Sequence, residues 1–169
     1  NLDELGRLSL KDLQKIKGIG EAKAVAITAA LELGGRRHTS DSLNRKTIRN
    51  SREIAEFLRT TLKDFNYEVF AVLFLNQANR IKHFEIISRG GITGTVADPR
   101  IILKKAVEEG ATSIVLSHNH PSGNLKPSRA DEELTQKIKQ AASFFDIRVL
   151  DHVIVSDEGY YSFADEGLI

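Results

Sequence analysis

Two histidines separated by one residue, His118 and His120, are the strongest candidates for chemistry in this chain. They follow the run TSIVLS, which is typical of a β-strand, and alternate side chains of a strand point to the same face. Asp131 lies eleven residues after His120, in the first turn of an expected helix. The Pro and Gly residues in between can turn the chain back toward the strand. Two histidines and one carboxylate form a ligand set that suits catalytic zinc, with a fourth position open to water.

The same residues also have a structural interpretation. A His-x-His pair on a strand can serve packing alone, and the pattern Ser128-x-x-Asp131 is a capping box at the start of a helix. The two interpretations are compatible, because a capping Asp can still direct one oxygen toward a metal. Five histidines in 169 residues is a modest number, so the pair does not follow from a histidine-rich composition.

The segments that would hold these residues alternate between helices and strands. Residues 51–169 are expected to form helix 51–62, strands 68–75 and 81–88, helix 98–110, strand 112–117, helix 128–145, and strands 147–155 and 160–163. This order predicts an α/β fold, with a mixed β-sheet and packed helices. Gly90, Gly91 and Gly94 form a glycine-rich turn that we expect to be a loop near the metal cleft.

The first 50 residues form a separate segment. We expect two helices in it, over residues 9–17 and 21–33, with a break at Gly18-Ile19-Gly20. Gly34-Gly35 is expected to end the second helix, because glycine is common just after a helix. The polar residues 36–50 predict a linker and a domain boundary.

Charge and composition bound the class of protein. Residues 1–50 carry ten Lys and Arg against six Asp and Glu, a net +4, whereas residues 51–169 carry fourteen against seventeen, a net −3. The 41% of hydrophobic residues is typical of a globular chain, and no apolar run approaches the roughly 18 residues of a membrane span. Cysteine is absent, which suits a reducing cytosol, so we expect a cytoplasmic protein. Methionine is absent as well, so we expect a fragment or a processed chain.

The string HNHPSG…PSRAD, residues 118–131, resembles the JAMM motif of MPN+ metalloproteases, and as a whole it resembles the RadC family. The resemblance covers residues 51–169, including LDHVIV and the tail YYSFADEG. Residues 1–35 are similar to the helix-hairpin-helix that precedes this domain in RadC proteins. The resemblance implies an MPN/JAMM domain of cytidine-deaminase-like architecture. It also implies a zinc-dependent metallopeptidase, acting on a peptide or protein, in a family historically linked to DNA repair.

The resemblance implies a role for each matched residue. His118, His120 and Asp131 would bind one zinc ion per chain. Glu68, at the start of an upstream strand, would act as the general base. Ser128 would donate a hydrogen bond to the developing oxyanion.

Two further residues bear on this site. Glu85, on the paired strand, is the alternative base that the residues themselves allow. His152 lies beside Asp151 in LDHVIV, and we expect it to support the structure around the site rather than to bind the metal.

The segment from Lys17 to Ala24 is similar to the hairpin of helix-hairpin-helix modules. The resemblance implies contacts of Lys17, Gly18, Gly20 and Lys23 with DNA phosphates, which carry no sequence information. Lys17 departs from the pattern, in which a hydrophobic residue or Pro is common. The alternative is an αα-hairpin whose glycines only permit a tight turn.

Three functions stay open at this point. A zinc-dependent hydrolase is favoured by the combination of Glu68, Ser128 and three ligands, because a purely structural zinc more often has four protein ligands. The alternative is a non-enzymatic DNA-associated module with a structural or vestigial metal site. A metal-dependent nuclease is less favoured, since two-metal sites need more clustered carboxylates.

Overall fold

The computed structural model describes residues 5, 8–43, 47–62, 65–90 and 97–169. Two compact units make up the chain, Asn1–Leu43 and Asn44–Ile169. The glycine-rich turn expected at Gly91 and Gly94, and residues 44–46 of the expected linker, lie outside the described residues. Within the described ranges, no helix combines the length and the apolar character that crossing a lipid bilayer requires.

The first unit consists of two helices, α2 (Leu10–Gln14) and α3 (Glu21–Leu43), joined by a turn. Gly18 in this turn has a φ of +90°, a conformation that glycine adopts more readily than any residue with a Cβ. Leu13 and Ala24, one from each helix, are buried. Both predicted helices and the break between them are therefore present.

The predicted end of the second helix at Gly34-Gly35 is wrong, because α3 continues to Leu43. Residues 36–43, expected as the beginning of the linker, are helical instead. A glycine inside a helix costs about 1 kcal/mol relative to alanine. Each residue added to an existing helix gains a hydrogen bond, however, and no proline follows Gly35 within residues 36–43. Extension of the helix therefore outweighs the two glycines.

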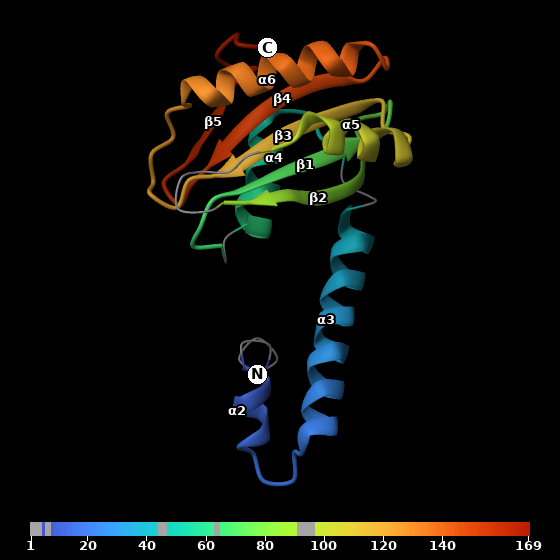
Figure 1. The fold of residues 1–169 in the computed structure, drawn as a ribbon, viewed down its shortest axis with the longest axis vertical. Coiled ribbons are helices and arrows are strands. Elements are labelled where there is room, and N and C mark those ends of the chain that lie inside the picture. The colour runs from blue at the N-terminus through green and yellow to red at the C-terminus, as the bar shows by residue number, and fades with distance from the viewer. Residues whose placement is uncertain (1–4, 6–7, 44–46, 63–64, 91–96) are drawn as a thin grey trace. The chain divides into compact units, whose positions relative to one another are not determined.

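The second unit is the mixed α/β fold that the sequence predicts (Figure 1). Its elements are α4 (Ser51–Leu62), β1 (Val69–Leu75), β2 (Ile81–Arg89), α5 (Pro99–Glu108), β3 (Ser113–Asn119), α6 (Arg129–Ser143), β4 (Arg148–Val155) and β5 (Tyr160–Ser162). The strands form one sheet in the order β2-β1-β3-β4-β5. β3 and β4 are parallel and connected through α6, whereas the other neighbouring strands are antiparallel.

Strand β3 is longer at its carboxyl end than the predicted strand 112–117. His118 pairs with Phe70 of β1, and Asn119 pairs with Val155 of β4. The backbone makes these pairs, so polar side chains do not stop the strand. His118 is therefore fixed inside the sheet.

Helices cover both faces of this sheet. α4 lies behind the sheet in the view of Figure 1 and contacts β4, whereas α5 and α6 contact each other. A single core cluster combines residues of β1 and β3 with residues of α5 and α6, among them Phe74, Leu116, Ile102 and Ile138. Every residue of β1 and β3 is buried. The centre of the sheet therefore holds its residues rigidly for any site built on it.

The connection from β3 to α6 brings Asp131 back toward the sheet. Gly123 in this loop has a φ of +84°, which permits the reversal. Ser128 then caps α6, and Asp131 is the third helical residue. Both halves of the capping box are present, because the Ser128 side chain accepts from the Asp131 backbone and the Asp131 side chain accepts from the Ser128 backbone. The start of the helix thus fixes the Asp131 carboxylate.

Candidate metal centre

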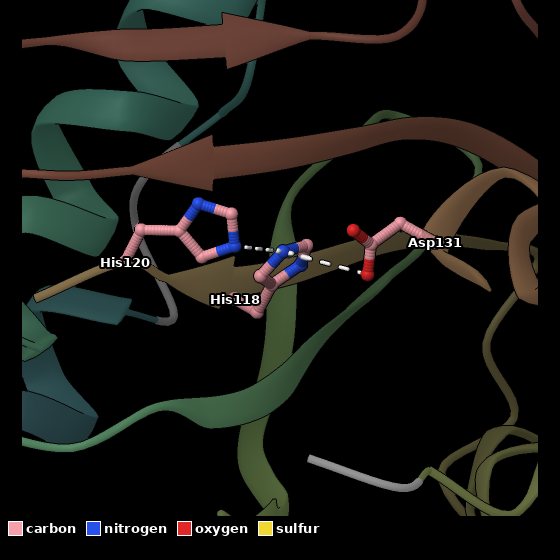
Figure 2. Close-up of side chains that lie close together, drawn as sticks. All are labelled: His118, His120 and Asp131. Atoms are coloured by element: carbon pink, nitrogen blue, oxygen red, sulfur yellow. Dashed lines mark hydrogen bonds and ion pairs between the residues drawn. The ribbon is translucent and has the colours of Figure 1, made fainter. Parts of the chain in front are cut away.

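Three side chains meet where β3 ends and α6 begins, as Figure 2 shows: His118, His120 and Asp131. One potential ligand atom from each lies within 4.8 Å of the other two. Nε2 of His118 lies 3.0 Å from Nε2 of His120 and 3.6 Å from Oδ1 of Asp131. The structure therefore brings together the three residues that the sequence predicts as metal ligands.

A buried chain of hydrogen bonds fixes the proton on His118. The Thr135 hydroxyl donates to the carbonyl oxygen of Asp131 at 2.6 Å, since a carbonyl can only accept. The same hydroxyl oxygen then accepts from Nδ1 of His152 at 2.6 Å. Nε2 of His152 is left as an acceptor, and Nδ1 of His118 donates to it at 2.8 Å. Nε2 of His118 consequently presents a lone pair to the other ligand atoms.

His120 is oriented by the loop that follows it. Its Nδ1 donates to the backbone carbonyl of Asn124, which leaves Nε2 as the acceptor. Its backbone N–H donates to the carbonyl of Val155 in β4 at 2.8 Å. Both imidazoles therefore turn an unprotonated Nε2 into the site, as a metal-binding histidine must.

Asp131 divides its two oxygens between the helix cap and the site. Oδ2 accepts from the backbone N–H of Ser128 at 2.7 Å and from the Ser128 hydroxyl at 2.6 Å. Oδ1 faces His118. The capping interpretation and the metal interpretation are therefore compatible in the observed geometry.

The three facing atoms are all hydrogen-bond acceptors, and this composition fits a cation. With both ring protons on Nδ1, the two Nε2 lone pairs approach to 3.0 Å with no hydrogen between them. Nitrogens bound to one tetrahedral zinc at about 2.0–2.1 Å are separated by roughly 3.3 Å, which is close to this distance. These residues can therefore hold one metal ion with little rearrangement.

Burial keeps His118 and His152 neutral. It lowers the pKa of His118 to about 4, against the opposing effect of the Asp131 carboxylate and with a smaller contribution from His120. Burial likewise holds the pKa of His152 well below its ordinary value. A metal ion near neutral pH would therefore not have to displace a proton from His118.

Glu68, the predicted general base, is the residue immediately before β1. Two residues later, Phe70 pairs with His118, and the two rings are stacked with centroids 6.2 Å apart. Alternate residues of a strand share one face. Extending the β1–β3 register by two residues therefore puts Glu68 on the same face as the histidines, opposite His120.

Glu85, the alternative base, is engaged elsewhere on the same face. It pairs with Val72, four residues beyond Glu68, which corresponds to roughly 13 Å at the usual rise of a strand. Its carboxylate forms ion pairs with Lys105 at 3.2 Å and with His83 at 3.3 Å. The geometry thus favours Glu68 over Glu85.

The residues predicted to contact DNA lie in the first unit. Lys17, Gly18 and Gly20 form part of the turn between α2 and α3, and Lys23 lies in the first turn of α3. Nζ of Lys23 donates to the carbonyl of Gly18 at 3.0 Å. Both lysines are exposed, so their charges are available on the surface of this unit.

A cavity of about 840 Å³ adjoins the candidate metal centre, with His120 in its wall. α4 forms one side of it, and the residues at and beyond the ends of β3 and β4 form the other. Arg59 of α4 links the two sides of the cavity, because its guanidinium donates to the carbonyl of Asp157 at 2.7 Å. The volume lies within the range of pockets that take up small molecules or several side chains.

Sequence reasoning missed Thr135, Asn119 and Asn124. Thr135 follows Asp131 by four residues, so the two share a helix face, and this spacing is a signal that could have found it. The Asn119 side chain contacts backbone groups, and Asn124 binds His120 through its own backbone carbonyl. The sequence carries no such signal for either contact. His152 holds the supporting position that the sequence predicts.

Comparison with known proteins gives a consistent result. The sequence model of the RadC-like JAB domain family matches residues 48–168. A "UPF0758 protein" of Flavobacterium johnsoniae is 46% identical over 168 residues, which is 99% of this chain and 73% of the relative. A "UPF0758 protein" of Chlorobium chlorochromatii is 44% identical over 169 residues, 100% of this chain and 76% of the relative. One from Streptococcus sanguinis is 41% identical over 166 residues, 98% of this chain and 73% of the relative.

We predict that Thr135→Val weakens metal binding without touching a ligand. Valine has the shape of threonine but cannot accept a hydrogen bond from Nδ1 of His152. The tautomers of His152 and His118 are then no longer fixed. Loss of such support typically costs about 10- to 100-fold in metal affinity, and we expect about 10-fold for zinc, measured by competition with a chelator.

Thr61→Val is the matched control for Thr135→Val. Thr61 makes the same type of hydrogen bond to its own helix, with the carbonyl of Phe57 at 2.8 Å. The Thr61→Val variant should bind zinc like the unmodified protein. Thr135→Ser, which keeps the hydroxyl, should retain most of the zinc affinity that Thr135→Val loses. Equal affinity of Thr135→Val and the unmodified protein would contradict the role of this hydrogen-bond chain.

Proposed function

The chain belongs to the RadC-like JAB domain family, and we propose that it is a zinc-dependent hydrolase of the JAMM type, a metallopeptidase that acts on a peptide or protein. The observation that carries the proposal is the set of three hydrogen-bond acceptors, on His118, His120 and Asp131, which face one another without a donor. Such a set binds one divalent cation per chain. Three protein ligands leave a position for water, as hydrolytic zinc sites require.

The residues around the site supply the other groups that hydrolysis requires. Zinc bound here would lower the pKa of a water molecule and polarise the substrate carbonyl. Glu68, on the same face as the histidines, accepts the proton of the attacking water and passes it to the leaving amine. Ser128 donates its hydroxyl hydrogen to the developing oxyanion, which requires it to exchange its hydrogen bond to Asp131 for one to the substrate.

The cavity beside His120 supports a substrate larger than a single amino acid. Its lining combines apolar side chains, such as Phe65 and Val155, with the polar side chains of Arg59 and Asn66. An extended polypeptide carries both kinds of group along its length. Of the three ligand residues only His120 lines this cavity, so a bound chain would approach the site from the side of His120.

The alternative function is a non-enzymatic module in which the metal is structural. A structural zinc is normally closed by a fourth protein ligand. Among the described residues, the ligand group comprises only His118, His120 and Asp131. The cavity beside His120 is also unnecessary for a structural ion. Both observations favour the hydrolase.

We predict one zinc ion per chain, and its loss in His118→Ala/His120→Ala, because that substitution removes two of the three ligands. Metal content is measured on purified, zinc-dialysed protein by elemental mass spectrometry. His83→Ala is the control, since His83 lies in β2 and its side chain contacts the Glu85 carboxylate, away from the three ligand residues. Unchanged zinc content in the double variant would exclude this metal site.

We predict that Glu68→Gln keeps zinc and loses hydrolysis. Glutamine retains the shape of the side chain but cannot accept a proton, and general-base removal typically costs about 10²- to 10⁴-fold in rate. Zinc-loaded protein is incubated with a mixture of unstructured peptides, and the products are identified by mass spectrometry. Glu85→Gln should cleave like the unmodified protein. Cleavage by Glu68→Gln together with inactivity of Glu85→Gln would reverse the assignment of the base.

We also propose that the first unit contacts DNA without regard to sequence. The proposal is supported by the exposed side chains of Lys17 and Lys23 and by the glycine turn between the two helices, whereas residues 1–43 as a whole carry a net charge of only +1, with seven Lys and Arg against six Asp and Glu. Exposed lysines and backbone amides in such a turn suit phosphate groups, which are the same in every sequence. Such a contact would tether the hydrolase to DNA, which is compatible with the historical link of the family to DNA repair.

We predict that Lys17→Gln/Lys23→Gln weakens DNA binding and makes it less dependent on salt. Each lost contact between a lysine and a phosphate reduces the slope of log affinity against log salt concentration by about 0.9 in magnitude. Affinity is measured by fluorescence anisotropy with two duplexes of unrelated sequence, which should bind equally. Lys104→Gln/Lys139→Gln, in the second unit, is the control of equal charge. An unchanged salt slope in Lys17→Gln/Lys23→Gln would show that the turn is only structural.

A further inference from the structure

Asn119, the residue between the two histidines, is buried at the point where the ladder between β1 and β3 ends. The last pair of that ladder joins Phe70 to His118. In a continued ladder, Val69 would pair with Asn119 through the backbone, and Glu68 would stand opposite His120. The side chain of Asn119, only 6% exposed, makes hydrogen bonds there instead.

Both ends of the Asn119 amide are used. Oδ1 accepts from the backbone N–H of Val69 at 2.7 Å. Nδ2 donates to the carbonyl oxygens of Tyr67 at 3.0 Å and Phe65 at 3.4 Å. The two shorter bonds therefore bracket Glu68, one on each side of it in the sequence.

These bonds determine the direction in which the Glu68 side chain leaves the backbone. The Tyr67 carbonyl belongs to the peptide group before the Glu68 Cα, and the Val69 N–H belongs to the peptide group after it. Two planar peptide groups fixed on either side of a Cα set its φ and ψ, and with them the direction of its Cα–Cβ bond. The carbonyl of Glu68 also accepts from the N–H of Gly90 at 2.6 Å. The second peptide group is thus held at both of its polar atoms.

We propose that Asn119 is a positioning residue that holds Glu68 in register with the metal ligands. The inference rests on the proposed function, in which Glu68 is the general base. Asn119 is joined covalently to both His118 and His120. Its hydrogen bonds therefore couple the position of the Glu68 backbone directly to the position of the ligands. Asn119 thereby helps to set the distance between base and metal.

The chemistry of the amide explains why asparagine suits this position. Bracketing Glu68 requires one acceptor for an N–H and one donor for a carbonyl, held in a fixed relation. An asparagine side chain supplies both on one rigid plane, whereas aspartate lacks the donor and a hydroxyl offers one oxygen only. Glutamine carries the same amide on a longer stem, which would not fit the observed distances.

The test compares Asn119→Ala, Glu68→Gln and the double variant, each loaded with Co²⁺ as a spectroscopic substitute for Zn²⁺. The visible absorption of Co²⁺ changes when water at the metal ionises, and the midpoint in pH depends on any carboxylate nearby. We expect both single substitutions to shift this midpoint in the same direction. The double variant should match Glu68→Gln alone, because the support of a base has no effect once the base is gone. Zinc affinity should stay within about threefold of the unmodified protein, since every ligand is retained.

Asn76 offers a matched control at the opposite end of β1. Its Oδ1 accepts from the backbone N–H groups of Ala78 at 2.9 Å and Arg80 at 3.0 Å. Asn76→Ala removes a similar pair of hydrogen bonds, and it should leave the midpoint unchanged. Asn119→Ser, which is less disruptive, replaces Asn119→Ala in the same comparison if the alanine variant does not fold.

Each departure from this result has a distinct meaning. A shifted midpoint in Glu68→Gln with an unshifted one in Asn119→Ala would overturn the positioning role, and so would additive shifts in the double variant. Loss of zinc from Asn119→Ala would overturn it as well, because Asn119 would then support the ligands. An unshifted midpoint in zinc-binding Glu68→Gln would instead overturn the base in the proposed function, and the positioning role with it.

Discussion

Two imidazole nitrogens and one carboxylate oxygen face one another at the end of β3, and all three can only accept hydrogen bonds. Free side chains would rotate away from such an arrangement or place a proton within it. Here each group is held by a bond on its other side: His118 by His152, His120 by the Asn124 carbonyl, and Asp131 by Ser128. Each of these bonds contributes about 1 kcal/mol, more where a charge takes part. The site is therefore ordered before a metal binds, so that binding costs little conformational entropy.

The bonds that order the site come from elements far apart in the sequence. His118 and His152 are 34 residues apart, and Thr135 and His152 are 17 residues apart. They meet only because β3 and β4 are parallel neighbours and α6, which connects them, begins beside the end of β3. The ligand geometry thus exists only in the folded second unit. A metal that binds this geometry and not the unfolded chain stabilises the fold in turn.

Features encoded by local sequence were predictable, and features that depend on distant contacts were not. The boundaries of α4, the capping box at Ser128 and the strand-helix alternation all follow from short-range patterns. The ligand set was also predictable, because its spacing on a strand and a helix start is local. The continuation of α3 past Gly34 was missed because cooperative helix extension competes there with a local stop signal. Thr135 and Asn119 were missed because their partners lie on other elements of the fold.

The motif His118-Asn119-His120 links the two halves of the proposed chemistry through the alternation of a strand. The histidines point to the face where α6 supplies Asp131, and Asn119, on the opposite side of the backbone, binds the N–H of Val69 at the beginning of β1. One tripeptide can therefore place the ligands and, at the same time, the backbone of Glu68. Another residue at the central position would leave the three ligands intact and remove the control over Glu68. In the proposed function, metal binding and correct placement of the base are therefore separable properties of this site, and a His-x-His pair by itself would specify only the first.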